Sequence, residues 1–391
     1  MSEIDGTTTT AARPPAVRVS TLELFFDLVF VFTLTQLTNV LVKHLDAAQV
    51  GRVVLMLFLI WWMYDGYAWL TNVVGPSSTT RRTLLLTGMA GFLVIALAIP
   101  DAYGAAGWAF GLAYLVVNVV HTALFTHADY RGSIRAMRRL GPLNLTSASL
   151  VFAGGLVDPP YRYWCWIAAA AVQVATPYLH RMGQHAISAG HFAERHALVM
   201  IIAIGESIVA IGLGFAGVPL DLSTITVAVL GLCVAYYLWW VYFAGDEERA
   251  KDALDSITDP LRRARVALHA WGYTHLGMIL GIVVLAAGVK KTVGHAFEPL
   301  GWGAALALGG GTALFLLAHA WFLRQLAIPG RVHRVAAALC VLAVVPVARV
   351  QAVVLLAAIP VIMATAMIIE DLPRLRASGG TAIHTFGRTE A

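Results

Sequence analysis

The stretch Glu-Leu-Phe-Phe-Asp-Leu-Val-Phe-Val-Phe at residues 23–32 opens the first long apolar run of the chain. It places two acidic residues, Glu23 and Asp27, in a segment that is otherwise suited to lipid. A charged side chain at membrane depth is costly, so it usually faces other helices and often marks a functional path. The stretch therefore predicts a membrane-spanning helix whose acidic side chains point into a helical bundle.

The composition of the whole chain agrees with this interpretation. Of its 391 residues, 59% are hydrophobic and 13% are charged, whereas roughly 25% are charged in soluble proteins. The mean hydropathy is +0.74. Apolar runs of about 20 residues recur, and a helix of that length crosses the ~30 Å core of a bilayer. The predicted fold class is an all-α integral membrane protein, surrounded by the lipid bilayer of the cell membrane.

The apolar runs predict about twelve transmembrane helices. The runs at 142–157 and 333–348 are short, and each fits either a half-crossing or one arm of a helical hairpin. The expected spans are 22–42, 52–74, 83–100, 105–126, 142–157, 161–180, 196–216, 221–244, 265–289, 299–322, 333–348 and 350–370.

The distribution of basic residues predicts the orientation of these helices. If the N-terminus is inside, the tails and loops on the inner side hold more than three quarters of the 27 Lys and Arg residues. Such an excess is typical of cytoplasmic loops. We therefore expect both termini in the cytoplasm, with disordered tails at 1–20 and 371–391. The net charge of +5 then reflects topology, and no nucleic-acid partner is expected.

Two short aromatic motifs indicate an internal repeat. Trp61-Trp62-Met63-Tyr64 lies in the second predicted span and Trp239-Trp240-Val241-Tyr242 in the eighth, and an acidic residue, Glu23 or Glu194, precedes each motif. Parallel repeats of this kind occur in transporters. Chance is the alternative, because Trp is common at membrane interfaces. The repeat predicts a first half at 21–180, a cytoplasmic His-containing linker at 181–195 and a second half at 196–370.

Ionisable side chains at membrane depth are the candidate functional residues. Glu206 and His275 lie about ten residues into their predicted spans, and Asp65 lies about nine residues from the inner end of its own. At ~1.5 Å per residue all three come near the bilayer centre, so they meet if their helices are neighbours. A satisfied internal hydrogen-bond network is the alternative. The predicted proton- or cation-binding residues are Glu206, Asp27, Asp65 and His275.

A second group of ionisable residues lies near the cytoplasmic ends of the spans. Glu23 and Asp27 are four residues apart and share one helix face. Acidic residues at a helix N-terminus are favoured by the helix dipole, so capping, or an ion pair with Arg18, is the alternative to a functional role. The predicted residues of a cytoplasmic entrance are Glu23, Glu194 and His191.

The segment 180–196 is rich in histidine, and His and Glu at such spacing can bind zinc. The usual zinc motifs are absent, as are the GxSxG, Walker A and HExxH signatures, so we expect no metal, no cofactor and no catalytic residues. An interfacial helix is the simpler interpretation of this segment. Gly309-Gly310-Gly311 is a candidate break in the tenth span, although three glycines also suit tight helix packing.

The motif at 23–30 resembles the bacterial low temperature requirement protein A (LtrA) family. The resemblance continues at 191–196, 204–209, 275–281 and 309–322, and it covers most of the chain between about 20 and 370. It implies a polytopic membrane protein without an agreed biochemical activity. Asp65 is inferred from its depth and is not a motif position. The residues that match the family motifs are Glu23, Phe25, Phe26, Asp27, His191, Glu194, Arg195, Gly205, Glu206, Ser207 and His275.

Three functions are compatible with these features. The first is a secondary transporter or an ion-conducting protein, whose buried carboxylates bind a proton, a small cation or a small-molecule substrate. The second is a non-transporting scaffold, lipid binder or sensor of membrane state, in which the acidic residues are structural. The third is a lipid-modifying enzyme with its site in the segment 180–196. The sequence favours the first and leaves the oligomeric state open.

Overall fold

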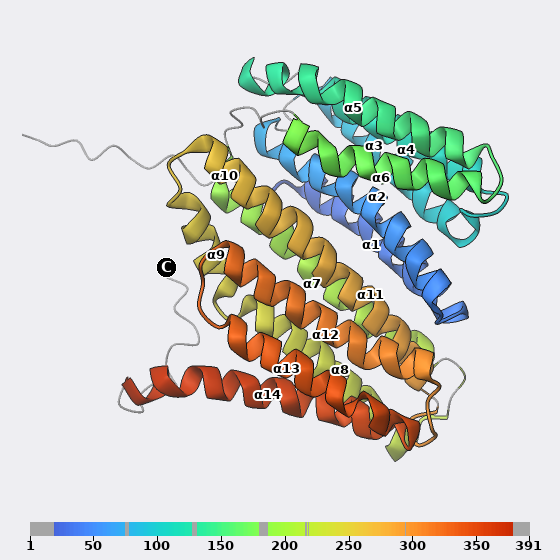
Figure 1. Cartoon of the computed structure of the whole chain (residues 1–391), viewed down its shortest axis with the longest axis vertical. Coiled ribbons are helices and arrows are strands. Elements are labelled where there is room, and N and C mark those ends of the chain that lie inside the picture. The colour runs from blue at the N-terminus through green and yellow to red at the C-terminus, as the bar shows by residue number, and fades with distance from the viewer. Residues whose placement is uncertain are drawn as a thin grey trace, which may run out of the picture.

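The computed structural model describes residues 19–74, 78–126, 131–179, 187–215, 217, 219–293 and 295–377. These residues form helices joined by short loops, with no strand among them. Figure 1 shows the helices as a bundle of long, roughly aligned rods. The α-helices are α1 (Thr21–Lys43), α2 (Ala47–Val73), α3 (Thr79–Ala98), α4 (Gly107–Thr126), α5 (Arg131–Gly155), α6 (Tyr161–Leu179), α7 (Ala189–Gly214), α8 (Leu222–Phe243), α9 (Asp246–Asp255), α10 (Pro260–Ala267), α11 (Thr274–Thr292), α12 (Trp302–Gln325), α13 (Arg331–Val344) and α14 (Ala352–Ala377).

Three short segments extend these helices. Ile99–Asp101 and Val345–Arg349 are 3₁₀ turns that follow α3 and α13. Leu268–Tyr273 is a π-helix that joins α10 to α11 without a break. A π segment inside an α-helix is rare and is often found at a functional site. The predicted span at 265–289 is therefore only part of a longer helix that begins at Pro260.

Every predicted span overlaps a long helix of the structure. Ten helices of the described chain are long and apolar enough to cross a membrane, so the protein is a multi-pass membrane protein. Two further helices, α5 and α6, lie at predicted spans but are not among these ten. The expected span at 142–157 differs most from the structure, because α5 begins at Arg131 and its first turns carry basic residues.

Local signals explain where several helices begin. Ser20 and Glu23 form a capping box on α1: the Ser20 hydroxyl accepts from the Glu23 amide, and the Glu23 carboxylate accepts from the Ser20 amide at 2.8 Å. Asp46 and Asp221 cap α2 and α8 through their side chains, which accept from the backbone amides of Gln49 and Thr224. Glu23 therefore caps α1, as the alternative interpretation of this residue predicts.

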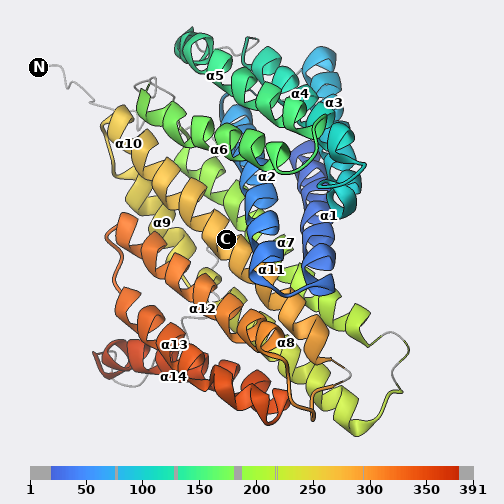
Figure 2. The ribbon, with the colours of Figure 1, turned by 45° about the vertical axis from the view of Figure 1, so that its right-hand side comes forward.

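The helices pack in two groups with a common pattern. In residues 21–179, α1 packs on α2 and α3, the successive pairs α3–α4, α4–α5 and α5–α6 are in contact, and α2 packs on α6. In residues 189–372, α7 packs on α8 and α11, the successive pairs α11–α12, α12–α13 and α13–α14 are in contact, and α8 packs on α14. The two groups meet where α1 and α2 contact α7 and α11, the junction seen in Figure 2.

Ion pairs bring the first turn of α1 and the last turns of α14 to the same end of the bundle. Glu23 on α1 lies beside the start of α7, and the start of α7 packs on α9. Asp246, the first residue of α9, pairs with Arg334 of α13 at 3.3 Å, and Arg334 also pairs with Glu370 of α14. A separate apolar core formed by α7, α9, α10 and α12 fills this end.

The Gly-rich part of α12 is tightly packed and unbroken, so the candidate break at Gly309-Gly310-Gly311 is wrong. α12 runs continuously from Trp302 to Gln325. A Cβ atom added at Gly311 would lie 2.8 Å from the carbonyl oxygen of Gly281 on α11, closer than atoms of real side chains approach. Small residues allow membrane helices to pack backbone to backbone in this way.

We expect Gly311→Ala to lower the free energy of unfolding by ~1–3 kcal/mol, because the added methyl group overpacks the contact between α11 and α12. Gly310→Ala is a matched control, since a Cβ atom at Gly310 has no neighbour within 4 Å. Thermal unfolding of both variants in the same detergent measures the difference. Equal midpoints for the two variants would contradict the close packing.

Candidate functional site

The first turns of α7 supply most of the polar side chains at the junction of the two groups of helices. α7 begins at Ala189, seven residues before the predicted span, so residues assigned to a linker are helical. His191, Arg195 and His196 lie on its buried face because residues four apart share a helix face. Glu194 lies on the opposite face and is exposed.

A buried ion pair fastens α7 to α1. Arg195 donates to the Asp27 carboxylate at 2.8 Å and to the backbone carbonyl of Glu23 at 3.0 Å. The hydroxyl of Tyr64 on α2 donates to the other oxygen of Asp27 at 2.6 Å. Asp27 and Arg195 are at most 1% exposed. Asp27 is therefore already paired with a cation of the protein, which differs from the proton- or cation-binding role predicted for it.

Of the three predicted entrance residues, Glu23 and His191 lie together, whereas Glu194 lies apart from them. His191 lies 3.3 Å from the carboxylate of Glu23, with both side chains buried. Asn72 at the end of α2 contacts His191 at 3.4 Å and bonds to the backbone of Ser188, so three helix ends are held together. Glu194 belongs to a different surface, where its carboxylate is close enough to Glu247 of α9 for the two charges to repel each other.

Asp65 and His196 form a second buried pair, between α2 and α7. One ring nitrogen of His196, Nδ1, lies 2.9 Å from the carbonyl oxygen of Phe192, and the other, Nε2, lies 3.0 Å from Oδ1 of Asp65. A carbonyl oxygen only accepts, so Nδ1 must carry a hydrogen. The contact to Asp65 then needs one more proton, carried either by Nε2 or by the carboxyl group. The pair thus holds one proton that two groups can share.

His275 lies next to this pair, as its shared depth with Asp65 predicted. Its ring centre is 5.2 Å from that of His196. Its Nδ1 contacts the carbonyl oxygen of Ala270 in the π-helix at 3.1 Å, and its Nε2 contacts the hydroxyl of Tyr242 at 2.8 Å. A neutral ring satisfies both contacts, with Nδ1 donating and Tyr242 donating to Nε2.

The π-helix is fixed to α2 beside the same pair. The indole nitrogen of Trp61 donates to the backbone oxygen of Gly272 at 2.7 Å. Gly272 also leaves room for Asp65, because a Cβ atom added there would lie 3.3 Å from Oδ2 of the carboxylate. The irregular turn at 268–273 therefore shapes the surroundings of Asp65.

Asp65 lines a cavity of about 110 Å³. Within the described chain its Oδ2 atom makes no hydrogen bond, and its side chain keeps 10% of its surface exposed. Most other lining side chains are apolar or aromatic, which is typical of small-molecule sites. The cavity lies among α2, α4, α5, α6 and the π-helix. Its lining residues are Trp62, Asp65, Gly66, Trp69, His121, Phe125, Met137, Leu140, Asn144, Thr176, Pro177 and Leu268.

Glu206 does not join Asp65 and His275, and the expectation that all three meet is wrong. It follows His196 by ten residues on α7, which places it ~15 Å further along the helix. Its partner is Thr35 of α1, whose hydroxyl donates to Oε2 at 2.6 Å. The predicted depth of Glu206 assumes that its helix begins at residue 196, but α7 begins about two turns earlier, at Ala189.

A basic side chain, Lys290, lies near Glu206. Lys290 of α11 contributes an attractive charge and donates to Asn39 of α1 at 2.9 Å. Asn39 is one helical turn beyond Thr35. Glu206 is 3% exposed, so this small polar group also lies inside the bundle, at the contact of α1, α7 and α11.

The sequence does not predict the contacts that four residues make with the predicted site residues: Tyr64, Arg195, His196 and Tyr242. The four-residue spacing between His191 and Arg195 is the signal that places both side chains on one helix face. The two tyrosines end the repeated aromatic motifs, and each donates to a buried ionisable side chain from its own half. The predicted span begins at His196, because hydropathy rises only after that residue.

No group of three or more His, Cys, Asp or Glu side chains within the described residues is arranged to hold a metal ion. His180 and His185 of the candidate zinc segment lie outside those residues. His191 and His196 contact different carboxylates, Glu23 and Asp65. They therefore belong to two separate pairs.

Comparison with known proteins agrees with the resemblance in the motifs. The family model described as bacterial low temperature requirement A protein (LtrA) matches residues 18–369. An uncharacterized protein of Rhizobium meliloti (strain 1021) is 31% identical over 315 residues, which cover 77% of this chain and 76% of the relative. The chain belongs to the LtrA family of membrane proteins.

Proposed function

We propose that the protein is a secondary transporter driven by proton exchange, in which the pair Asp65–His196 is the proton-binding site. The observation that carries this proposal is the double contact of His196 with two oxygen acceptors. It requires one proton shared between an acid and a base. Asp65 also lines a cavity, so that proton has a route to a bound molecule or to water. Buried ionisable side chains in membrane helices commonly act in proton relays.

The position of the pair supports the same proposal. Many transporters consist of two repeats, with the substrate and ion sites at the repeat interface. The recurring helix contacts and the matching tyrosines favour two related halves here, roughly 21–180 and 196–370. Asp65 on α2 and His196 on α7 would then face each other across that interface. The cavity would open on the cytoplasmic side, where the basic residues gather.

Glu206 would be a second proton site, reached from the other side of the membrane. Between His196 and Glu206 the buried side chains of α7 are apolar, among them Val199, Met200 and Ala203. Such a layer blocks a continuous proton path. Transport would therefore need a change in packing at the junction, which agrees with alternating access.

A flux measurement tests this proposal. Native protein in liposomes, given a pH gradient and a potassium ionophore to hold the voltage, should dissipate the gradient faster than protein-free liposomes. Glu206→Gln should slow this flux at least about tenfold, a ratio equivalent to ~1.4 kcal/mol, because an amide keeps the bond to Thr35 but does not titrate. Proton flux is followed with a pH-sensitive dye inside the vesicles.

Glu248→Gln is the matched control, because Glu248 is exposed on α9. It should conduct like the native chain. Native flux equal to that of empty liposomes would contradict proton transport. Equal flux in the native and Glu206→Gln proteins would exclude Glu206 from the path.

A further inference from the structure

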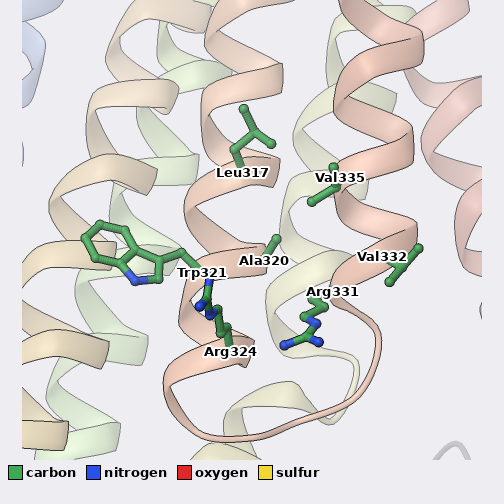
Figure 3. Close-up of a pocket in the computed structure, with 7 residues that line it drawn as sticks. All are labelled: Leu317, Ala320, Trp321, Arg324, Arg331, Val332 and Val335. Carbon is green, nitrogen blue, oxygen red and sulfur yellow. The ribbon is translucent and has the colours of Figure 1, made fainter.

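A groove of about 570 Å³ runs between α12 and α13, away from the junction that holds the proton-binding pair. Figure 3 shows its lining residues at the end of the bundle where a short loop joins the two helices. Arg331 extends from the start of α13 toward α12, and Trp321 and Arg324 come from the last turns of α12. The lining residues are Leu317, Ala320, Trp321, Arg324, Arg331, Val332 and Val335.

The two arginines of the groove are free to bind an external anion. Both are exposed, and neither forms an ion pair with any residue that the structure describes. Arg334, one turn further along α13, differs because it is buried and paired with Asp246 and Glu370. Arginine suits phosphate recognition, since its planar guanidinium donates two parallel hydrogen bonds.

The rest of the groove changes from aromatic to aliphatic along the helices. Trp321 is 43% exposed beside the arginines, and Trp side chains favour the headgroup level of a bilayer. Further from the loop the walls are Leu317 and Val335, which are 39% and 38% exposed. Cationic, aromatic and aliphatic surfaces therefore follow one another in the same order as the phosphate, interfacial region and acyl chain of a phospholipid.

We propose that this groove binds a phospholipid with an anionic headgroup. Arg324 and Arg331 hold the headgroup phosphate, and one acyl chain lies against Leu317, Ala320 and Val335. Basic pockets between membrane helices on the cytoplasmic side are known to bind anionic headgroups. The short loop fixes the spacing of the two arginines, because Ala327 and Gly330 hold the chain in the left-handed region at φ values of 56° and 111°. The site does not depend on proton transport.

Native mass spectrometry of the full chain in detergent tests the site, with phosphatidylglycerol, phosphatidylcholine and inorganic phosphate as three separate probes. The native protein should retain phosphatidylglycerol in preference to phosphatidylcholine. Arg324→Gln with Arg331→Gln should weaken phosphatidylglycerol binding ~25-fold, about fivefold for each arginine near the membrane surface. Binding of phosphatidylcholine, whose phosphate is neutralised by its own choline, should weaken less.

Arg262→Gln with Arg265→Gln is the matched control, since it also removes two exposed positive charges. It should bind phosphatidylglycerol like the native chain. The proposal would be overturned if the groove variant bound phosphatidylglycerol as tightly as the native protein. It would also be overturned if the control variant lost as much phosphatidylglycerol binding as the groove variant. Saturation of the groove by inorganic phosphate at the same concentration would show an ion site in place of a lipid site.

Discussion

Arg195→Met is expected to lower the free energy of unfolding by ~3–5 kcal/mol, because it leaves the Asp27 carboxylate buried without its cation. Asp27 is completely buried, and among the described residues only Tyr64 would remain to donate to it. The backbone carbonyl of Glu23 would also lose its hydrogen bond from Arg195. Thermal or denaturant unfolding in one detergent measures the effect.

The double variant Asp27→Asn with Arg195→Met provides the internal control for this prediction. It removes both charges, so it should be more stable than Arg195→Met alone, as expected for a coupled pair. Arg262→Met makes the same substitution at an exposed position and should unfold like the native protein. If Arg195→Met unfolds like Arg262→Met, the ion pair does not fasten α1 to α7.

The sequence alone predicts the helical membrane body well. Apolar runs of about 20 residues recur because a helix that crosses the lipid needs this length, and the structure has a helix at each run. The prediction fails at helix ends that contact protein, such as 189–195. Apart from Phe192, those residues are polar or small, so hydropathy places the segment outside the membrane. In the structure all of them except Gly190 and Glu194 are buried, at the contacts of α7 with α1, α2 and α9.

The candidate site could be predicted only in part. Asp65 and His275 were found because ionisable residues are rare in apolar runs, and the structure places both beside His196. Long-range packing decides which helices are neighbours, and the spacing of residues in the sequence does not reveal it. The pairing of Asp27 with Arg195, and of Glu206 with Thr35, depends on that packing.

Asp65→Asn should have the largest effect on transport among single substitutions. An asparagine amide can donate to Nε2 of His196, so the contact between α2 and α7 survives. The shared proton is lost, because neither partner then needs or releases one. We expect the fold to remain intact and the proton flux to fall at least about tenfold, a ratio equivalent to ~1.4 kcal/mol.

The most direct measurement compares proton flux through Asp65→Asn and Asp252→Asn in liposomes of the same lipid and protein content. Asp252 is exposed on α9, so its substitution makes the same chemical change away from the junction. We predict that Asp252→Asn conducts protons at the native rate. A folded Asp65→Asn should conduct only at the protein-free rate. Native flux through both variants would contradict a proton site at Asp65 and His196.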